Sequence, residues 1–336
     1  MNAIKPSASY ITETSWFQPN YIVDFKYHIH SLISTGGFGQ VYWASDNYTG
    51  QFVAIKVEKK DAKYQLLKFE AETLSKLNKI SYKRHGKGKK FDCIKLINYF
   101  ETKNFNFMVM PLCGPNFYEI RKAMIEEKFS ITTTLWVMKN MISCLEGLHN
   151  YGWIHRDVKP ANFCIDLYNT NDCRRKMYLV DFGLAKKFRK SDGSMIPKKD
   201  YSNFKGTVRY TSINSHRRRD LGRIDDLWSV YFICVENLIG SLPWRNIADK
   251  EEIGYMKKEC NLLELNYGST GPPNSFKVLY EQLRSTGFYN EPKYGELYDA
   301  IENEMRDFGY YSHGKLLDWE ECGIINLILF QKGISN

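Results

Sequence analysis

The most informative part of the chain is Trp153-Ile154-His155-Arg156-Asp157-Val158-Lys159-Pro160-Ala161-Asn162, followed further on by Val180-Asp181-Phe182-Gly183. These residues have the order and spacing of a phosphoryl-transfer site, where a protein mainly positions groups and neutralises charge. Asp157 is spaced to accept the proton of an attacking hydroxyl. Asn162 and Asp181 are spaced to hold Mg²⁺ across the phosphates of ATP. The complete ordered set, rather than any single residue, indicates this chemistry.

Composition narrows the class of protein. The 336 residues carry a formal net charge of +9, which favours acidic or phosphorylated partners over basic ones. The eight cysteines include no C-x-x-C pair, so a zinc site or a disulfide framework is a poor interpretation. Residues 1–20 lack the apolar core of a signal peptide, and the apolar run 324–330 is too short to span a bilayer. We expect a monomer without membrane contact in the cytoplasm, with the nucleus as the alternative compartment.

The predicted elements divide into a strand-rich part and a helix-rich part. Alternating apolar residues and turn residues predict strands at 27–48 (a hairpin), 51–57, 94–100 and 105–110. Helical periodicity predicts helices at 65–77, 132–151, 225–238, 276–286 and 294–308. This order predicts an α+β chain of two lobes. Residues 1–25 are interpreted as an irregular leader, 26–311 as the domain and 312–336 as a tail.

Further motifs resemble those of one family. The segment Gly206-Thr207-Val208-Arg209-Tyr210-Thr211-Ser212-Ile213-Asn214 ends in Ser-Ile-Asn, where most protein kinases have Ala-Pro-Glu. With the catalytic stretch, this ending resembles the casein kinase I group of protein kinases. Asp225–Ser229 and Gly240–Arg245, with the preceding His216–Arg219, look closest to the tau-tubulin kinase family. The resemblance implies a bilobal kinase fold with an N-lobe at about 26–110, a hinge at 111–114 and a C-lobe at 115–311.

The glycine-rich stretch Ile33–Val41 stands where a kinase has its phosphate-binding loop. Its glycines, Gly36, Gly37 and Gly39, would let backbone amides approach phosphates. Ser34 replaces the first glycine of the kinase pattern. A glycine-rich turn alone is more often a plain hairpin, but Lys56 downstream favours the functional interpretation.

By the same resemblance, Lys56 contacts the α- and β-phosphates and pairs with a glutamate of the next helix. Glu70 is the expected partner and Glu72 the alternative. Met110 is the expected gatekeeper, and adenine would use the Pro111 carbonyl and the Cys113 amide. The residues expected to enclose the adenine ring are Val41, Ala54 and Cys164.

Two residues favour Ser/Thr substrates over Tyr. Lys159 resembles the lysine of Ser/Thr kinases that bridges the γ-phosphate and the substrate hydroxyl, and Thr207 resembles the threonine that supports the catalytic aspartate. We therefore count Asp157, Lys159, Asn162 and Thr207 as the catalytic set.

Basic residues gather in and after the activation segment. A run of charges is usually a solvated face, but Arg suits phosphate because its guanidinium donates two hydrogen bonds. Arg209, Lys205 and Arg217 are the candidate anion site for acidic or pre-phosphorylated protein substrates. Arg156 matches a residue that pairs with an activation-loop phosphate in other kinases. None of the nearby hydroxyls stands in a recognisable activation motif, so the resemblance implies activity without that modification.

Two other functions fit the sequence less well. A catalytically weak pseudokinase scaffold would show degraded catalytic residues, and only Ser34 is irregular here. A nucleic-acid binder would need aromatic side chains interleaved with the basic ones or a known reading motif, and neither is clear. The sequence therefore predicts a serine/threonine protein kinase that uses ATP and Mg²⁺.

Overall fold

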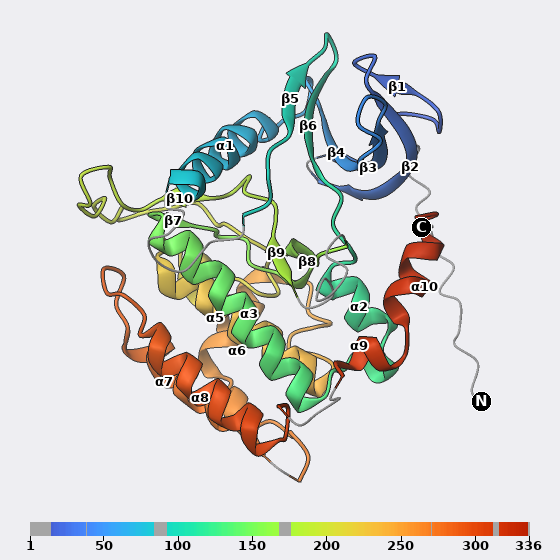
Figure 1. The fold of residues 1–336 in the computed structure, drawn as a ribbon. Helices are drawn as coiled ribbons and strands as arrows, with labels where there is room; N and C mark the ends of the chain where they lie inside the picture. Colours follow the sequence, from blue (N-terminus) through green and yellow to red (C-terminus); the bar gives the residue numbers. More distant parts are fainter. Residues whose placement is uncertain are drawn as a thin grey trace. The chain divides into compact units, whose positions relative to one another are not determined.

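The computed structural model contains a sheet unit and a helical unit (Figure 1). The sheet unit comprises Met1–Ala71 and Lys95–Leu112, and the helical unit comprises Glu72–Ile94 and Cys113–Asn336. The structure describes residues 15–37, 39–83, 93–167, 176–269, 271–311 and 316–334. The predicted α+β class with a strand-rich first part and a helix-rich remainder is confirmed.

The sheet unit is built on one antiparallel sheet with the strand order β1-β2-β3-β4-β6-β5. The strands are β1 (Ile22–Val23), β2 (Tyr27–Gly36), β3 (Gly39–Asp46), β4 (Phe52–Lys59), β5 (Asn98–Glu101) and β6 (Phe105–Pro111). Buried and partly exposed residues alternate strictly along β3, as expected for a strand with one face on a core. The predicted strand at 94–100 begins only at Asn98.

The end of the leader belongs to this core. Phe17 is buried, and its ring lies 5.5 Å from that of Tyr42 and 5.1 Å from that of Phe105. The backbone N–H groups of Trp16 and Phe17 both donate to the Tyr42 hydroxyl. Residues 15–25 were expected to be irregular, but an aromatic anchor and the pairing of β1 with β2 join them to the sheet. Residues 1–14 lie outside the described residues.

The helical unit contains the long central helices α3 (Ile131–Asn150) and α5 (Arg223–Ile239), which pack against each other. Ser130 caps α3 by accepting a hydrogen bond from the Thr133 amide, and α5 ends where Gly240 adopts a left-handed φ of 84°. Its other helices are α1 (Leu67–Lys83, which begins in the sheet unit), α2 (Phe117–Ala123), α4 (Ile213–His216), α6 (Lys250–Glu259), α7 (Asn274–Ser285), α8 (Tyr294–Asp307), α9 (Asp318–Glu321) and α10 (Ile324–Gln331). Short strand pairs join β7 (Trp153–Ile154) to β10 (Lys186–Lys187), and β8 (Phe163–Ile165) to β9 (Met177–Leu179). The helices expected at 65–77, 132–151, 225–238, 276–286 and 294–308 are confirmed, and the first of them continues to Lys83.

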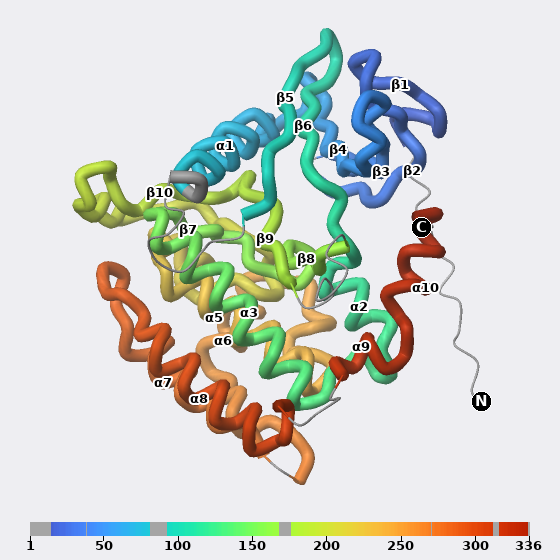
Figure 2. The backbone as a smooth tube through the Cα atoms, in the orientation of Figure 1, coloured from blue at the N-terminus to red at the C-terminus, as the bar shows by residue number. Residues whose placement is uncertain are grey.

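The tail packs onto the helical unit, and α10 runs beside α2 (Figure 2). Trp319 is fully buried, and its ring lies 5.5 Å from that of Phe117 and 5.7 Å from that of Trp136. The Asp318 carboxylate accepts hydrogen bonds from the Ser130 amide and hydroxyl at 2.6 and 2.7 Å. The described part of the tail is therefore an integral layer of this unit. Among the described residues, none of the helices combines the length and the apolar character needed to cross a membrane.

Candidate active site

The loop after β7 brings the predicted catalytic residues together. Asp157 is buried, and one of its carboxylate oxygens accepts a hydrogen bond from the Thr207 hydroxyl at 2.8 Å. The other oxygen lies 2.9 Å from the Lys159 ammonium nitrogen. The chain can pass this close to the catalytic loop only with glycine at position 206, because Gly206 has a φ of 89° and an added Cβ would lie 2.7 Å from the Arg156 carbonyl oxygen. The carboxylate is thus held between a hydroxyl and an ammonium group.

The two predicted metal ligands are connected through the same loop. The Asn162 side-chain amide donates to the Asp157 carbonyl at 2.9 Å, which leaves its own oxygen as an acceptor. The Val180 amide donates to the Asn162 carbonyl at 2.9 Å and so ties the residue before Asp181 to Asn162. One amide oxygen and one carboxylate suit Mg²⁺, which prefers oxygen ligands and takes its remaining ligands from phosphates and water. The donor set therefore fits a Mg²⁺ ion bound with ATP.

The Asp226 side chain of α5 contacts the backbone of the catalytic loop. Its carboxylate accepts the backbone N–H groups of His155 and Arg156, each at 2.8 Å, and lies 2.9 Å from a ring nitrogen of His149. Burial raises the pKa of Asp226, but the hydrogen bond and charge of His149 and the charge and amide of His155 outweigh it, so the pKa is lowered. Asp226 therefore fixes the backbone of the catalytic loop directly before Asp157.

The sheet unit supplies the other predicted nucleotide residues. The Lys56 ammonium lies 2.7 Å from the Glu70 carboxylate, and both side chains are largely buried. Glu72 is exposed and lies 3.9 Å from Lys76, so the structure selects Glu70 as the partner. Strand register places Val41 opposite Lys56.

The glycines of the β2–β3 turn differ in what they do. Gly39 has a φ of 136°, and an added Cβ would lie 2.0 Å from the Val57 carbonyl oxygen, so the approach of β4 requires glycine there. An added Cβ at Gly36 or Gly37 would meet nothing within 4 Å. Ser34 is exposed and pairs with Val41, directly after a register shift between Leu32 and Ser34, so β2 accommodates the missing glycine within an irregular part of the strand. Phe38 lies outside the described residues.

The hinge residues fall at the end of β6 and just beyond it. Ala54 stands opposite Met110 in the sheet, and Pro111 is the last residue of β6. Within the helical unit, burial and then the neighbouring Cys164 raise the pKa of the Cys113 thiol, while burial raises that of Cys164 to about 12. Both thiols are therefore protonated at neutral pH and act as small apolar groups.

Comparison with known proteins identifies the family. The protein kinase domain family model matches residues 27–287. The chain belongs to this family. A probable serine/threonine-protein kinase of Dictyostelium discoideum is 35% identical over 305 residues, which are 90% of this chain. The chain spans 58% of that relative's length. The predicted bilobal kinase fold is confirmed by this match.

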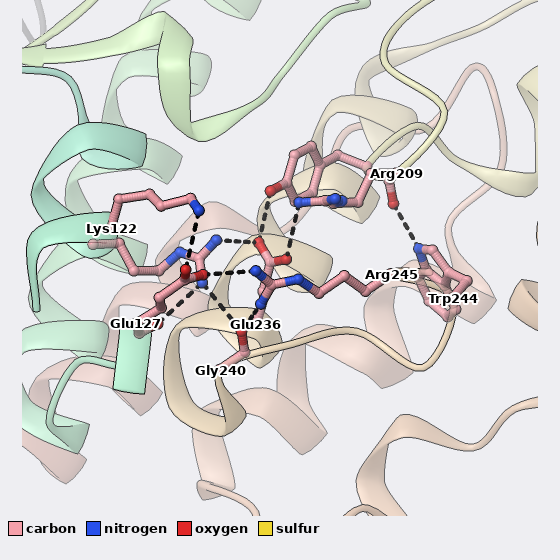
Figure 3. A network of polar contacts seen from close by, with 9 residues as sticks. Lys122, Glu127, Arg209, Glu236, Gly240, Trp244 and Arg245 are labelled. Carbon is pink, nitrogen blue, oxygen red and sulfur yellow. Dashed lines mark hydrogen bonds and ion pairs between the residues drawn. The ribbon is translucent and has the colours of Figure 1, made fainter. Parts of the chain in front are cut away.

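The kinase domain holds its activation segment through a buried network around Glu236 (Figure 3). Glu236 is fully buried, lies 2.9 Å from an Arg121 guanidinium nitrogen and accepts the Tyr210 hydroxyl at 2.6 Å. Arg121 also donates to the carbonyls of Glu127 and Gly240, so this buried ion pair is hydrogen-bonded on several sides. The network joins α2, α5 and the segment that carries Thr207.

Two further side chains that sequence reasoning did not assign to the site hold the same segment. The Lys257 ammonium, buried in α6, donates to the carbonyls of Val208 and Thr211 at 2.6 and 2.7 Å. Burial lowers the pKa of Lys257 well below its ordinary value. The Trp244 indole N–H donates to the Arg209 carbonyl at 2.9 Å. Trp244 belongs to the Gly240–Arg245 motif, whereas nothing in the pattern around Lys257 distinguishes it from the exposed lysines nearby.

The three residues of the candidate anion site have different surroundings. Arg209 is partly buried, with a guanidinium nitrogen 3.5 Å from Glu236. The Lys205 backbone N–H donates to Ser215, and its side chain is half-buried. Arg217 is exposed. No hydrogen bond joins these three side chains to one another in the part of the chain that the structure describes, so Arg217 is the member most open to a substrate.

Proposed function

We propose that the protein is a serine/threonine protein kinase that transfers the γ-phosphate of ATP to hydroxyls of protein substrates. The observation that carries this proposal is the placement of Asp157 between the Thr207 hydroxyl and the Lys159 ammonium. A bond forms between the substrate oxygen and the γ-phosphorus while the bond to the β–γ bridging oxygen breaks, and ADP leaves. The hydroxyl proton passes to the Asp157 carboxylate, which Thr207 orients.

The remaining residues neutralise charge that shifts during transfer. Lys159 is close enough to Asp157 to reach a phosphate beside the reacting hydroxyl, and Lys56 is held ready by Glu70 for the other phosphates. Asn162 and Asp181 would bind Mg²⁺, which offsets the phosphate charge when bound. Chelation of divalent metal should therefore abolish transfer.

The test is phosphate transfer from Mg-ATP to casein, with the phosphorylated residue type identified. Asp157→Asn keeps the shape of the side chain and removes the base, so transfer should fall by about 10²–10⁴-fold while nucleotide still binds. Asp192→Asn, at an exposed aspartate, is the matched control and should leave the rate unchanged. If neither the native protein nor Asp157→Asn transferred phosphate while both still bound ATP, a pseudokinase scaffold would be favoured.

We further propose that the protein belongs to the casein kinase I group, near the tau-tubulin kinases, and prefers acidic or pre-phosphorylated substrates. The Ser-Ile-Asn ending supports this placement because Ser212 and Asn214 both donate to the buried Asp225 carboxylate, at 2.6 and 2.9 Å. Through these two contacts Asp225 anchors the Ser-Ile-Asn ending. A different ending would need a different anchor. The exposed Arg217, beside Arg218 and Arg219, supports recognition of a negatively charged substrate.

A pair of peptides that differ only in one pre-installed phosphate tests the preference. Arg217→Glu should raise the KM of the phosphorylated peptide selectively, and Arg284→Glu, an exposed charge change on α7, is the control. Arg209→Glu is less informative because this arginine also contacts Glu236. Equal effects of Arg217→Glu on both peptides would contradict an anion site.

A further inference from the structure

A buried carboxylate lies at the end of the basic run that follows the activation segment. Asp220 is 2% exposed, and both of its oxygens lie 2.6 Å from the Lys186 ammonium nitrogen. One of these oxygens also accepts the Lys199 backbone N–H at 3.0 Å. Burial raises the pKa of Asp220, but Lys186 and the Lys199 amide outweigh it, so the pKa is lowered and the group is charged at neutral pH.

The contacts of Asp220 reach the catalytic loop. Lys186 lies in β10 opposite Ile154 of β7, directly before His155 and Arg156. The Arg156 guanidinium donates to the Leu184 carbonyl at 2.7 Å, and it is half-buried. Burial lowers the pKa of Arg156, and the charges of Asp220 and Asp226 oppose that effect, so Asp220 is one of the two anions that compensate this arginine.

Two stretches of the chain therefore contact Asp220 directly, and a third carries a charge that acts on it. Lys186 comes from the start of the activation segment, Lys199 from its middle and Arg156 from the catalytic loop. A phosphate group placed by modification could hold such cationic and N–H groups together through its oxygens. In this protein the two carboxylate oxygens of Asp220 occupy the position of such a phosphate, and Lys186 contacts both of them.

We propose that Asp220 is a positioning residue that supplies the anion needed to hold the activation segment against the catalytic loop, so that transfer requires no phosphorylation of this segment. This inference rests on the proposed kinase function and specifies how its site is kept ordered. Asp220 acts through Lys186, Lys199 and Arg156. An ordinary buried ion pair would explain the contact with Lys186, but not the additional hydrogen bond from the Lys199 amide or the charge compensation of Arg156.

The test uses the full chain after phosphatase treatment. Native protein should keep its rate, whereas Asp220→Asn should lower kcat at least tenfold with the KM for ATP within twofold. In Asp220→Gly, which removes the side chain, sodium sulfate should restore the rate several-fold, while sodium chloride at equal ionic strength should not. Asp192→Gly, at an exposed position in the same segment, is the control and should respond to neither salt.

Hydrogen exchange of the amides at 186–205 provides a readout that does not depend on activity. Asp220→Asn should speed exchange there, and sulfate should slow it again in Asp220→Gly. Loss of native activity on phosphatase treatment, a native rate in Asp220→Asn, or failure of sulfate to act on rate and exchange would each overturn the inference. If the native protein transferred no phosphate, the proposed function would fail and the exchange result alone would decide the role of Asp220.

Discussion

Replacing Glu236 by Gln tests how much the buried network of Figure 3 contributes to stability. The change keeps the size of the side chain and removes its charge, so the Arg121 guanidinium, 1% exposed, loses its carboxylate partner at 2.9 Å. Breaking one side of a buried ion pair typically costs about 3–5 kcal/mol. Arg121 keeps its hydrogen bonds to the Glu127 and Gly240 carbonyls, so we expect the lower end, about 3 kcal/mol.

Thermal unfolding measured by circular dichroism reports this loss. A cost of about 3 kcal/mol should lower Tm by roughly 4–6 °C for a domain of this size, because the entropy of unfolding grows with chain length. Glu127→Gln is the matched control, because Glu127 also meets two cations, Lys122 and Arg245, but its side chain is 25% exposed. Solvent screens such a pair, so its loss should cost less than about 1 kcal/mol.

A double variant tests the physical cause. If the cost in Glu236→Gln comes from an uncompensated charge, then adding Arg121→Met should destabilise less than the sum of the two single changes, by about 0.5–3 kcal/mol. The reasoning would be refuted by additive effects, or by a Glu236→Gln variant as stable as Glu127→Gln.

Three further predictions concern other buried groups. Trp319→Ala should cost about 3–5 kcal/mol of unfolding free energy, whereas Phe330→Ala, at a side chain that is 75% exposed, should cost almost nothing; equal Tm values would contradict the docking of the tail. Burial and then Lys257 lower the pKa of His216 from 6.5 to about 4, so the unfolded chain takes up a proton that the folded chain resists and stability should fall as pH drops from about 6.5 to about 4. That loss, up to about 3 kcal/mol, should disappear from the pH profile of unfolding in His216→Gln. Lys257→Met should lower kcat for peptide phosphorylation without changing the KM for ATP, Lys257→Arg should recover part of the rate, and a change confined to Tm would show a purely structural role.

Much of the fold follows from local patterns. The period of apolar residues predicted α3, α5, α7 and α8 within a few residues, because each helix buries one continuous stripe. The catalytic set was also recognisable, since Asp157, Lys159 and Asn162 are close in sequence and their spacing alone brings them near one another. The sequence favoured Glu70 over Glu72, and the structure settled the choice, because Glu70 is buried beside Lys56 whereas Glu72 lies on another face of α1 and is exposed.

The unpredicted contacts join residues far apart in the chain. Asp220 follows three arginines, a pattern typical of a solvated surface, yet it is buried against Lys186. Lys257 lies among charged residues of α6 and reaches carbonyls of a segment more than forty positions earlier. The local periodicity of the sequence does not predict such contacts, because the burial of a polar group depends on a hydrogen-bond partner that can be far away in the chain.

The two aromatic anchors outside the family match have a consequence for fragments of this protein. The match covers residues 27–287, whereas Phe17 and Trp319 lie beyond those limits and are buried. A fragment cut at the limits of the match would uncover the end of the sheet core and the aromatic cluster of Phe117 and Trp136. The newly exposed apolar surface would favour aggregation. The folded unit therefore extends beyond the residues that the family match covers.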